Sequence, residues 1–179
     1  MAVSEFNLNQ GQRAERKLLI TVAEWKETTG TTESTVREIL GTRTEDSSIE
    51  YNPDIETTTD ILGINYTDLN RTQPQQDFDP YLVLGGSRLG AKLNDIRRRN
   101  ALSELDQFTV YVITAFVGTT GSYEAEKHTG CTIAYNSIGG DSNVNFPISV
   151  YFSNNITTGT VDKLADDFVF TADVTVVGG

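Results

Sequence analysis

The stretch NFPISVYFS, residues 145–153, shows the clearest alternation of apolar and polar side chains in this sequence. Successive side chains of a β-strand point to opposite faces, so the pattern predicts a strand with one face in a core. The apolar face would carry Phe146, Ile148, Val150 and Phe152. Pro147 lies on the other face and lacks a backbone N–H, which suits the start of a strand or an edge strand.

Four further stretches have β character. Residues 17–25 and 107–118 are apolar on both parities, which predicts strands covered on both faces, the second of them central in its sheet. Residues 130–138 and 168–177 alternate. In the latter, the inward side chains would be Phe168, Phe170, Ala172 and Val174. Turns are expected at three glycine-containing sites: 118–121, 139–141 and 157–159.

One helix is expected, over about residues 87–100, in the sequence SRLGAKLNDIRRRN. Ser87 can cap its first turn, and a narrow apolar stripe is formed by Leu89, Leu93 and Ile96. The other side chains are polar, so the stripe should pack onto a sheet. The predicted fold is therefore mainly β: an antiparallel β-sandwich or barrel with one short flanking α-helix and long loops.

Three polar segments are expected to lie outside the core. Residues 1–15 would form a flexible N-terminal arm ahead of a single β-domain, residues 16–179. Residues 27–35 are predicted to form a turn or a mobile hairpin tip. Residues 70–80, rich in Pro and Gln, are predicted to form a long exposed loop.

The most acidic stretch is EDSSIEYNPDIETTTDILG, residues 45–63, which holds six carboxylates and no basic residue. Its sequence predicts two strands joined by a turn at residues 52–54, where Asn, Pro and Asp follow one another. The core-facing side chains would be Ile49, Tyr51, Ile55 and Ile61. The opposite side or the turns would carry Glu50, Asp54, Glu56 and Asp60.

The charge of the whole chain limits its partners. At pH 7 the 179 residues carry a formal net charge of -11, from 25 acidic and 14 basic residues. Such a surface repels nucleic acid and anionic membranes. The single Cys131 excludes an intrachain disulfide, which fits a reducing cytosol. No export signal and no apolar run of about 18 residues is present, so membrane insertion is not expected.

The sequence offers no constellation that predicts catalysis, and we expect no enzyme activity, catalytic residue, cofactor or metal. Glu124, Glu126 and His128 share one parity, but no second cluster would complete a metal site, so a solvated hairpin is favoured. Cys131 has only the lone His128 available as a base, and the glycines at residues 85–92 lack the spacing of a phosphate-binding loop.

The predicted helix concentrates positive charge. Five basic residues against Asp95 give it a local charge of +4. These candidates for contact between subunits are Arg88, Lys92, Arg97, Arg98 and Arg99. Two interpretations stay open: a solvated outer face, or a head-to-tail contact with the acidic part of another copy.

The order of these segments resembles a known family. TEDSSIEYNPDIETTTDILG is followed by a strand with Tyr and Thr, a polar loop, a basic helix ending in DIRRRNAL and a long apolar strand. This order, over residues 25–176, is similar to that of the major tail tube proteins of long-tailed, siphovirus-type bacteriophages.

The resemblance implies a structural protein of the virion tail, assembled in the cytoplasm of a host bacterium. Such proteins form homo-hexameric rings that stack around the tape measure protein and end at tail terminator and distal tail proteins. Phage DNA passes through the acidic lumen without specific binding. The implied lumen-lining candidates are Glu50, Asp54, Glu56 and Asp60. Residues 1–15, 27–35 and 70–80 would order between rings.

Other classes remain as alternatives: a carbohydrate-binding or adhesive β-sandwich, a capsid decoration protein, or the tube of a contractile injection machine. A sugar-binding surface usually presents aromatic side chains to solvent. The only tryptophan, Trp25, lies in a strand that we expect to be covered.

Overall fold

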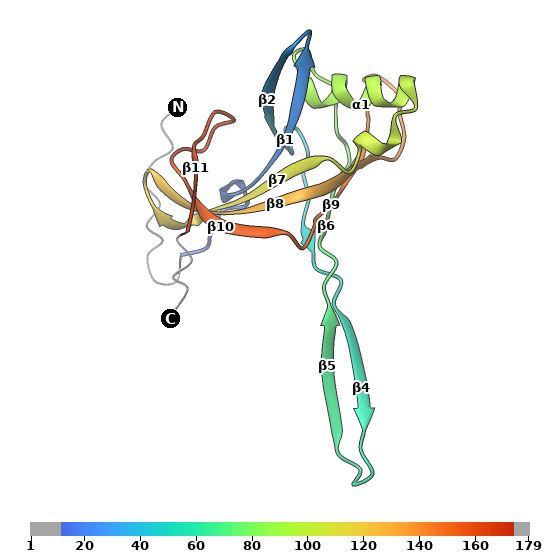
Figure 1. The fold of residues 1–179 in the computed structure, drawn as a ribbon, viewed down its shortest axis with the longest axis vertical. Coiled ribbons are helices and arrows are strands. Elements are labelled where there is room, and N and C mark those ends of the chain that lie inside the picture. The colour runs from blue at the N-terminus through green and yellow to red at the C-terminus, as the bar shows by residue number, and fades with distance from the viewer. Residues whose placement is uncertain (1–11, 174–179) are drawn as a thin grey trace.

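The computed structural model describes residues 12–173 and consists mainly of antiparallel strands (Figure 1). The main path runs in the order β2 (Thr32–Ile39), β1 (Leu19–Thr29), β7 (Phe108–Thr119), β8 (Ser122–Tyr135), β9 (Ile148–Tyr151), β6 (Gln75–Phe78) and β3 (Ile49–Glu50). Off this path, β10 (Ile156–Val161) pairs with β8, and β11 (Phe170–Ala172) pairs with β10. Between residues 12 and 173 the only α-helix is α1 (Arg88–Arg99), with two 3-10 turns, η1 (Arg16–Leu18) and η2 (Leu102–Glu104). The predicted β-sandwich with one short helix is confirmed.

β8 joins the two layers of the sandwich. Its first half pairs with β10, and its last four residues pair with β9. Between the halves, Gly130 has a φ of 79°, and the register with β7 shifts beside it. A bend of this kind lets one strand take part in two sheets. The strand predicted at residues 130–138 is therefore the end of the longer strand β8. The first half of β8 contains Glu124, Glu126 and His128, for which a solvated hairpin is predicted from the sequence.

Two apolar clusters hold the fold together, one on each face of β1 and β7. The larger lies between the two layers and includes Trp25, Phe108, Ile148 and Val150. The smaller covers the opposite face and is centred on Tyr111. The prediction that β1 and β7 are covered on both faces is confirmed, and Trp25 is almost fully buried.

α1 lies where its sequence predicts. Ser87 Oγ accepts a hydrogen bond from the Gly90 N–H, and the helix ends at Asn100, which has a φ of 53°. The three side chains of the predicted stripe are fully buried: Leu89, Leu93 and Ile96. A second cap comes from β2, because Glu38 Oε2 accepts from the N–H groups of Arg88 (2.7 Å) and Leu89 (2.9 Å). A carboxylate at this position also interacts favourably with the helix dipole.

Replacing Glu38 by glutamine should therefore lower the free energy of unfolding by about 1–3 kcal/mol, because the cap loses its negative charge and one of its two acceptor oxygens. Urea unfolding would measure this. Glu33→Gln is the matched control, since among residues 12–173 Glu33 forms only an exposed ion pair with Lys26, and its loss should change stability by less than about 1 kcal/mol. Equal effects of the two substitutions would contradict the capping role.

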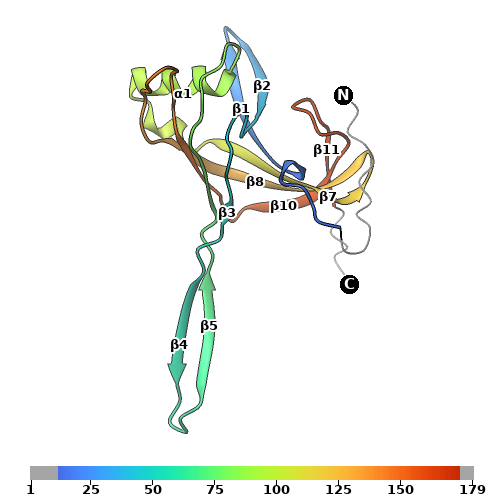
Figure 2. The same ribbon diagram turned by 180° about the vertical axis from the view of Figure 1, so that it is seen from behind.

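The predicted turn at residues 52–54 is wrong. β4 (Asp54–Thr59) pairs with β5 (Asn65–Arg71), and the turn lies at residues 60–64, which we call the tip. Asn52 has a φ of 42°, and its side-chain amide donates to the Gln73 carbonyl, so the chain kinks there and continues outward. The result is a β4–β5 hairpin that projects from the body (Figures 1 and 2).

The prediction of which side chains in residues 45–63 face the core is therefore also wrong for most of them. Only Ile49 packs against the core. The other side chains predicted to face a core are exposed: Tyr51, Ile55 and Ile61.

Two other local predictions are corrected. Residues 70–80 are not one loop, since β6 forms there and buries Gln76 and Phe78. The turn expected at 157–159 is instead the middle of β10, where a Cβ on Gly159 would clash with the Thr171 carbonyl oxygen. Glycine is used here for close strand approach and not for a turn.

The predictions for the two ends of the chain are confirmed only in part. At the last strand, Phe168 is buried as expected and Ala172 is exposed. Val174 lies outside the described residues, as do residues 1–11 of the predicted arm. The described part of that arm, residues 12–15, is exposed.

Candidate assembly surface

The four acidic residues predicted to line a lumen lie in two places. Glu50 ends β3 within the body, opposite Gln75 of β6. Asp54, Glu56 and Asp60 lie on β4 and at the tip of the β4–β5 hairpin. The structure therefore brings three of the four onto one projecting element.

The β4–β5 hairpin has two chemically different faces, because directly opposed residues of paired strands share a face. Beyond the bulge that follows the ion-paired Asp54 and Arg71 at the base, one face holds no charge and is formed by the pairs Ile55–Leu69, Thr57–Thr67 and Thr59–Asn65. We call it the uncharged face. The other is formed by the pairs Glu56–Asp68 and Thr58–Tyr66. We call it the acidic face.

This hairpin has little to stabilise it in a single chain. Every residue of β4 and β5 is exposed, and within the described part of the chain these strands pair only with each other. A two-stranded hairpin alone is marginally stable in water. Glu56 and Asp68 add like-charge repulsion across the strands. The hairpin has the properties of an element that is stabilised by a neighbour.

The tip presents apolar side chains beside a fixed negative charge. Asp60 Oδ1 accepts hydrogen bonds from the backbone N–H groups of Leu62 (2.8 Å) and Ile64 (2.9 Å). The bond from Ile64 is the main cause that lowers the pKa of Asp60 below its ordinary value, so this carboxylate is charged at neutral pH. Ile61 is fully exposed, and Leu62 is 77% exposed.

The basic residues of α1 divide into two groups. Arg99 forms ion pairs with Asp95 (2.7 Å) and Glu104 (2.8 Å), and Lys92 pairs with Glu104 (2.6 Å). These two cations are neutralised within the chain. The other three make no ion pair with any residue from 12 to 173: Arg88, Arg97 and Arg98. They remain candidates for contact with another copy.

The basic helix and the acidic hairpin lie at opposite ends of the molecule. α1 lies at one end of the longest axis and the tip at the other (Figures 1 and 2). Within one chain the two elements therefore cannot meet. Any contact between them must join two copies of the chain.

The ion pairs of Glu104 predict a pH dependence of stability. Hydrogen bonds from Arg99 and then Lys92 lower the pKa of Glu104 to about 2. A carboxylate with a lowered folded pKa stabilises the protein above its unfolded pKa of about 4.3, and this contribution is lost as pH falls towards 2. The difference in Tm between the native protein and Glu104→Gln should be constant above about pH 5 and shrink below it. A difference that is independent of pH down to 2 would contradict this.

Glu124, Glu126 and His128 do not form a metal centre. No group of three such ligands occurs among the residues described. His128 is buried, contrary to the expected solvated hairpin, and its ring packs against Phe152. Its Nδ1 lies 3.1 Å from the Ser153 carbonyl oxygen, and its Nε2 lies 3.3 Å from a Glu126 carboxylate oxygen. These contacts make His128 a satisfied core residue.

Cys131 is likewise part of the core. Its side chain is fully buried, and burial raises the pKa of the thiol. A protonated and covered thiol is a poor nucleophile.

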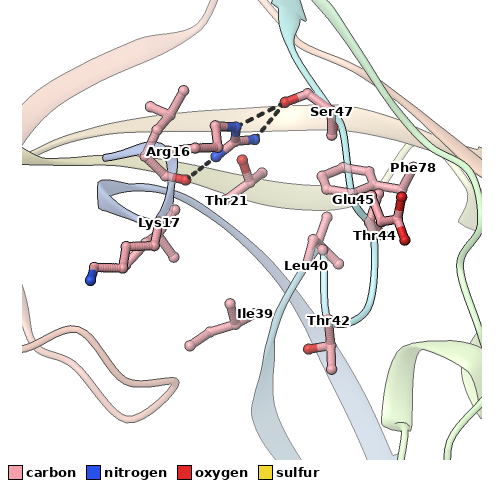
Figure 3. A pocket seen from close by; sticks show the side chains of 13 residues that line it. Arg16, Lys17, Thr21, Ile39, Leu40, Thr42, Thr44, Glu45, Ser47 and Phe78 are labelled. Carbon is pink, nitrogen blue, oxygen red and sulfur yellow. Dashed lines mark hydrogen bonds between the residues drawn. The ribbon is translucent and has the colours of Figure 1, made fainter. Parts of the chain in front are cut away.

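A pocket of about 370 Å³ with a mixed polar and apolar lining lies beside η1 (Figure 3). Its apolar lining comes from Leu19, Ile20, Ile39, Leu40 and Phe78, and its charged groups from Arg16, Lys17 and Glu45. We call it the η1 pocket. No pattern in the sequence predicts this pocket, because three segments far apart along the chain build it and none of them carries a recognisable motif.

Between residues 12 and 173, no helix is long and apolar enough to cross a membrane. A comparison with models of known protein families found no match to this sequence, and a comparison with curated proteins found none either.

Proposed function

We propose that this protein is a structural subunit that assembles into stacked hexameric rings and forms the tail tube of a long-tailed bacteriophage. The tube would be a conduit with an acidic lumen for DNA passage during infection. Its site of action would be the virion tail, after assembly in the cytoplasm of the host bacterium.

The observation that carries this proposal is the exposed β4–β5 hairpin. Ile55 and Leu69 oppose each other on its uncharged face and are 57% and 61% exposed. A long projecting ribbon with apolar side chains needs a covering surface, because isolated hairpins are marginal in water. A neighbouring copy provides that surface in a homo-oligomer.

The two faces of the hairpin suit two different roles. The uncharged face suits contact with the neighbouring subunit, and the acidic face suits a channel that carries DNA. An acidic wall gains nothing from counterion release and therefore does not retain a duplex. Glu50, Asp54, Glu56 and Asp60 are the lumen candidates, and Asp68 joins them as the partner of Glu56 on the acidic face.

The partners follow from the resemblance of the sequence to tail tube proteins. They are further copies of the chain, the tape measure protein inside the tube, and the tail terminator and distal tail proteins at its ends. Phage DNA would pass without specific binding. Three cations that form no ion pair within the described part of the chain are proposed contacts between subunits: Arg88, Arg97 and Arg98.

Negative-stain electron microscopy of the purified protein tests the proposal. Six-fold rings or tubes are expected, with a diameter on the order of 10 nm from the packing of compact domains of this size. Light scattering at rising concentration should show the mass growing beyond the monomer. A protein that remains monomeric at high concentration would overturn the proposal.

A further inference from the structure

We propose that a buried chain of hydrogen bonds through Thr21, Gln76, Ser47 and Arg16 sets the direction in which the β4–β5 hairpin leaves the body. We call these four residues the root network, and we call β3 and β6, from which the hairpin extends, the root. The inference rests on the proposed self-assembly and adds to it a set of positioning residues within the body.

The root network joins the sheet that contains β1 to the sheet that contains β6. The Thr21 hydroxyl donates to Gln76 Oε1 (2.8 Å), and Gln76 Nε2 donates to Ser47 Oγ (3.1 Å). Ser47 Oγ in turn donates to the Asp77 carbonyl oxygen (2.7 Å). The Ser47 carbonyl oxygen accepts two bonds from the Arg16 guanidinium, at 3.1 and 2.6 Å (Figure 3). Each member therefore fixes the place of the next.

The burial of this network points to positioning more than to stability. Thr21 and Gln76 are only 3% and 1% exposed, although glutamine is seldom fully buried. An apolar pair of the same shape often gives equal stability, because a buried polar pair first loses its bonds to water. A fully bonded polar network selects one arrangement of the strands that carry it, since any other arrangement leaves buried groups without partners.

The root needs such a selection because little else fixes β3. This strand has two residues, and it pairs with β6 through Ile49–Gln76 and Glu50–Gln75. β6 is held by four pairs with β9, whereas β3 is the end strand of the described sheet. A slip of one residue would move β3 by about 3.4 Å and turn Ile49 away from the core. Gln76 opposes Ile49 and also binds Ser47, so the network and the native register require each other.

The register of the root is passed on to the hairpin. The chain runs from β3 to β4 through residues 51–53 and returns from β5 to β6 through residues 72–74. The Gln73 N–H donates to the Tyr51 carbonyl oxygen (2.9 Å), which keeps the two connections together. A slip of β3 along β6 would shift one connection relative to the other and tilt the hairpin. The uncharged face would then no longer meet the neighbouring copy.

Engineered cysteines measure the register in the single chain, because Cys131 is the only native cysteine and is buried. Glu50→Cys and Gln75→Cys oppose each other, and opposed strand residues have Cα atoms about 4.5–5.5 Å apart, within the reach of a disulfide. Oxidised glutathione is the oxidant. In a background with Thr21→Val and Gln76→Met, which we call the apolar variant, the disulfide is expected to form at least about tenfold more slowly, because only chains in the native register react.

The Tm of the apolar variant should change by less than about 4 °C, since apolar groups of similar shape replace both polar partners. Ser149→Ala is the matched control: it removes another buried side-chain bond, from Asn136 Nδ2 (3.0 Å), and should leave the rate of disulfide formation unchanged. Thr21→Ser keeps the hydroxyl donor and should react at nearly the native rate. A native rate in the apolar variant would overturn the inference.

Electron microscopy then connects the register to assembly. The apolar variant with both engineered cysteines is expected to form no rings when reduced and to regain them when oxidised, because the disulfide holds the native register. Rings formed by the reduced variant, or no rings after oxidation, would overturn the positioning role and leave the proposed function standing. If the native chain itself forms no rings while the apolar variant still reacts slowly, the proposed function fails and the control of the register by the root network stands.

Discussion

Replacing Ile55 and Leu69 together by serine is expected to abolish ring and tube formation while leaving the Tm of the monomer nearly unchanged. Both side chains lie on the uncharged face, and both are more than half exposed in the single chain. Exposed substitutions away from special features usually change stability by less than about 0.5 kcal/mol. About three-fifths of each side chain is left to bury, so the two substitutions remove about 2–4 kcal/mol per hairpin from assembly if a neighbouring copy covers this face.

That loss corresponds to a decrease of roughly 30-fold to 1,000-fold in the association constant for each contact. Sedimentation or light scattering would measure the change, and electron microscopy would show whether rings persist. Ile138→Ser with Val144→Ser is the matched control, since these side chains are similarly exposed but lie outside the hairpin. Assembly of the hairpin variant at the native concentration would mean that the uncharged face is not buried between subunits.

The sequence predicts the fold class well because core-facing alternation is a local property. Ile148 and Val150 on β9, and the stripe of Leu89 and Leu93 on α1, are all fully buried as expected. In each case the period of the apolar residues matches the period of the element, and one chain contains both surfaces that pack together.

The same reasoning fails on the β4–β5 hairpin for a physical reason. Alternation of Tyr51 and Ile55 with acidic residues shows that a segment is suited to partial burial, but it does not say which chain supplies the covering surface. In the monomer these side chains are exposed. The turn was also misplaced, because Asn52 and Pro53 form a kink while Asp60 accepts the hydrogen bonds that close the tip.

The candidate assembly surface was therefore predicted only in part. Charge indicates the basic residues of α1, and charge together with the resemblance to tail tube proteins indicates the acidic residues of the hairpin. The division of the hairpin into two faces needs the register that pairs Glu56 with Asp68, and this register depends on the turn. The caps from Glu38 and the ion pairs of Glu104 join residues distant in the sequence, and no local pattern indicates them.

Reversing the charge of the acidic face, with Glu56→Lys and Asp68→Lys, is expected to leave tubes intact and to slow the passage of DNA. The uncharged face that supports assembly is unchanged, and a Lys–Lys pair replaces one like-charge pair by another. In a six-fold ring the lysines would repeat around the lumen and bind phosphates, releasing counterions from the DNA. DNA would then adhere to the wall instead of sliding along it.

Ejection rates of particles that carry the variant measure this effect. Retention by phosphate contacts weakens steeply with salt, so higher ionic strength should restore much of the rate. Glu56→Gln with Asp68→Asn is the matched control, because it removes the charge without adding attraction and should alter ejection much less. Native ejection kinetics in the lysine variant would exclude the acidic face from the lumen. If the lysine variant fails to assemble while the neutral variant forms tubes, the acidic face would instead meet the free cations of α1 on a neighbouring copy.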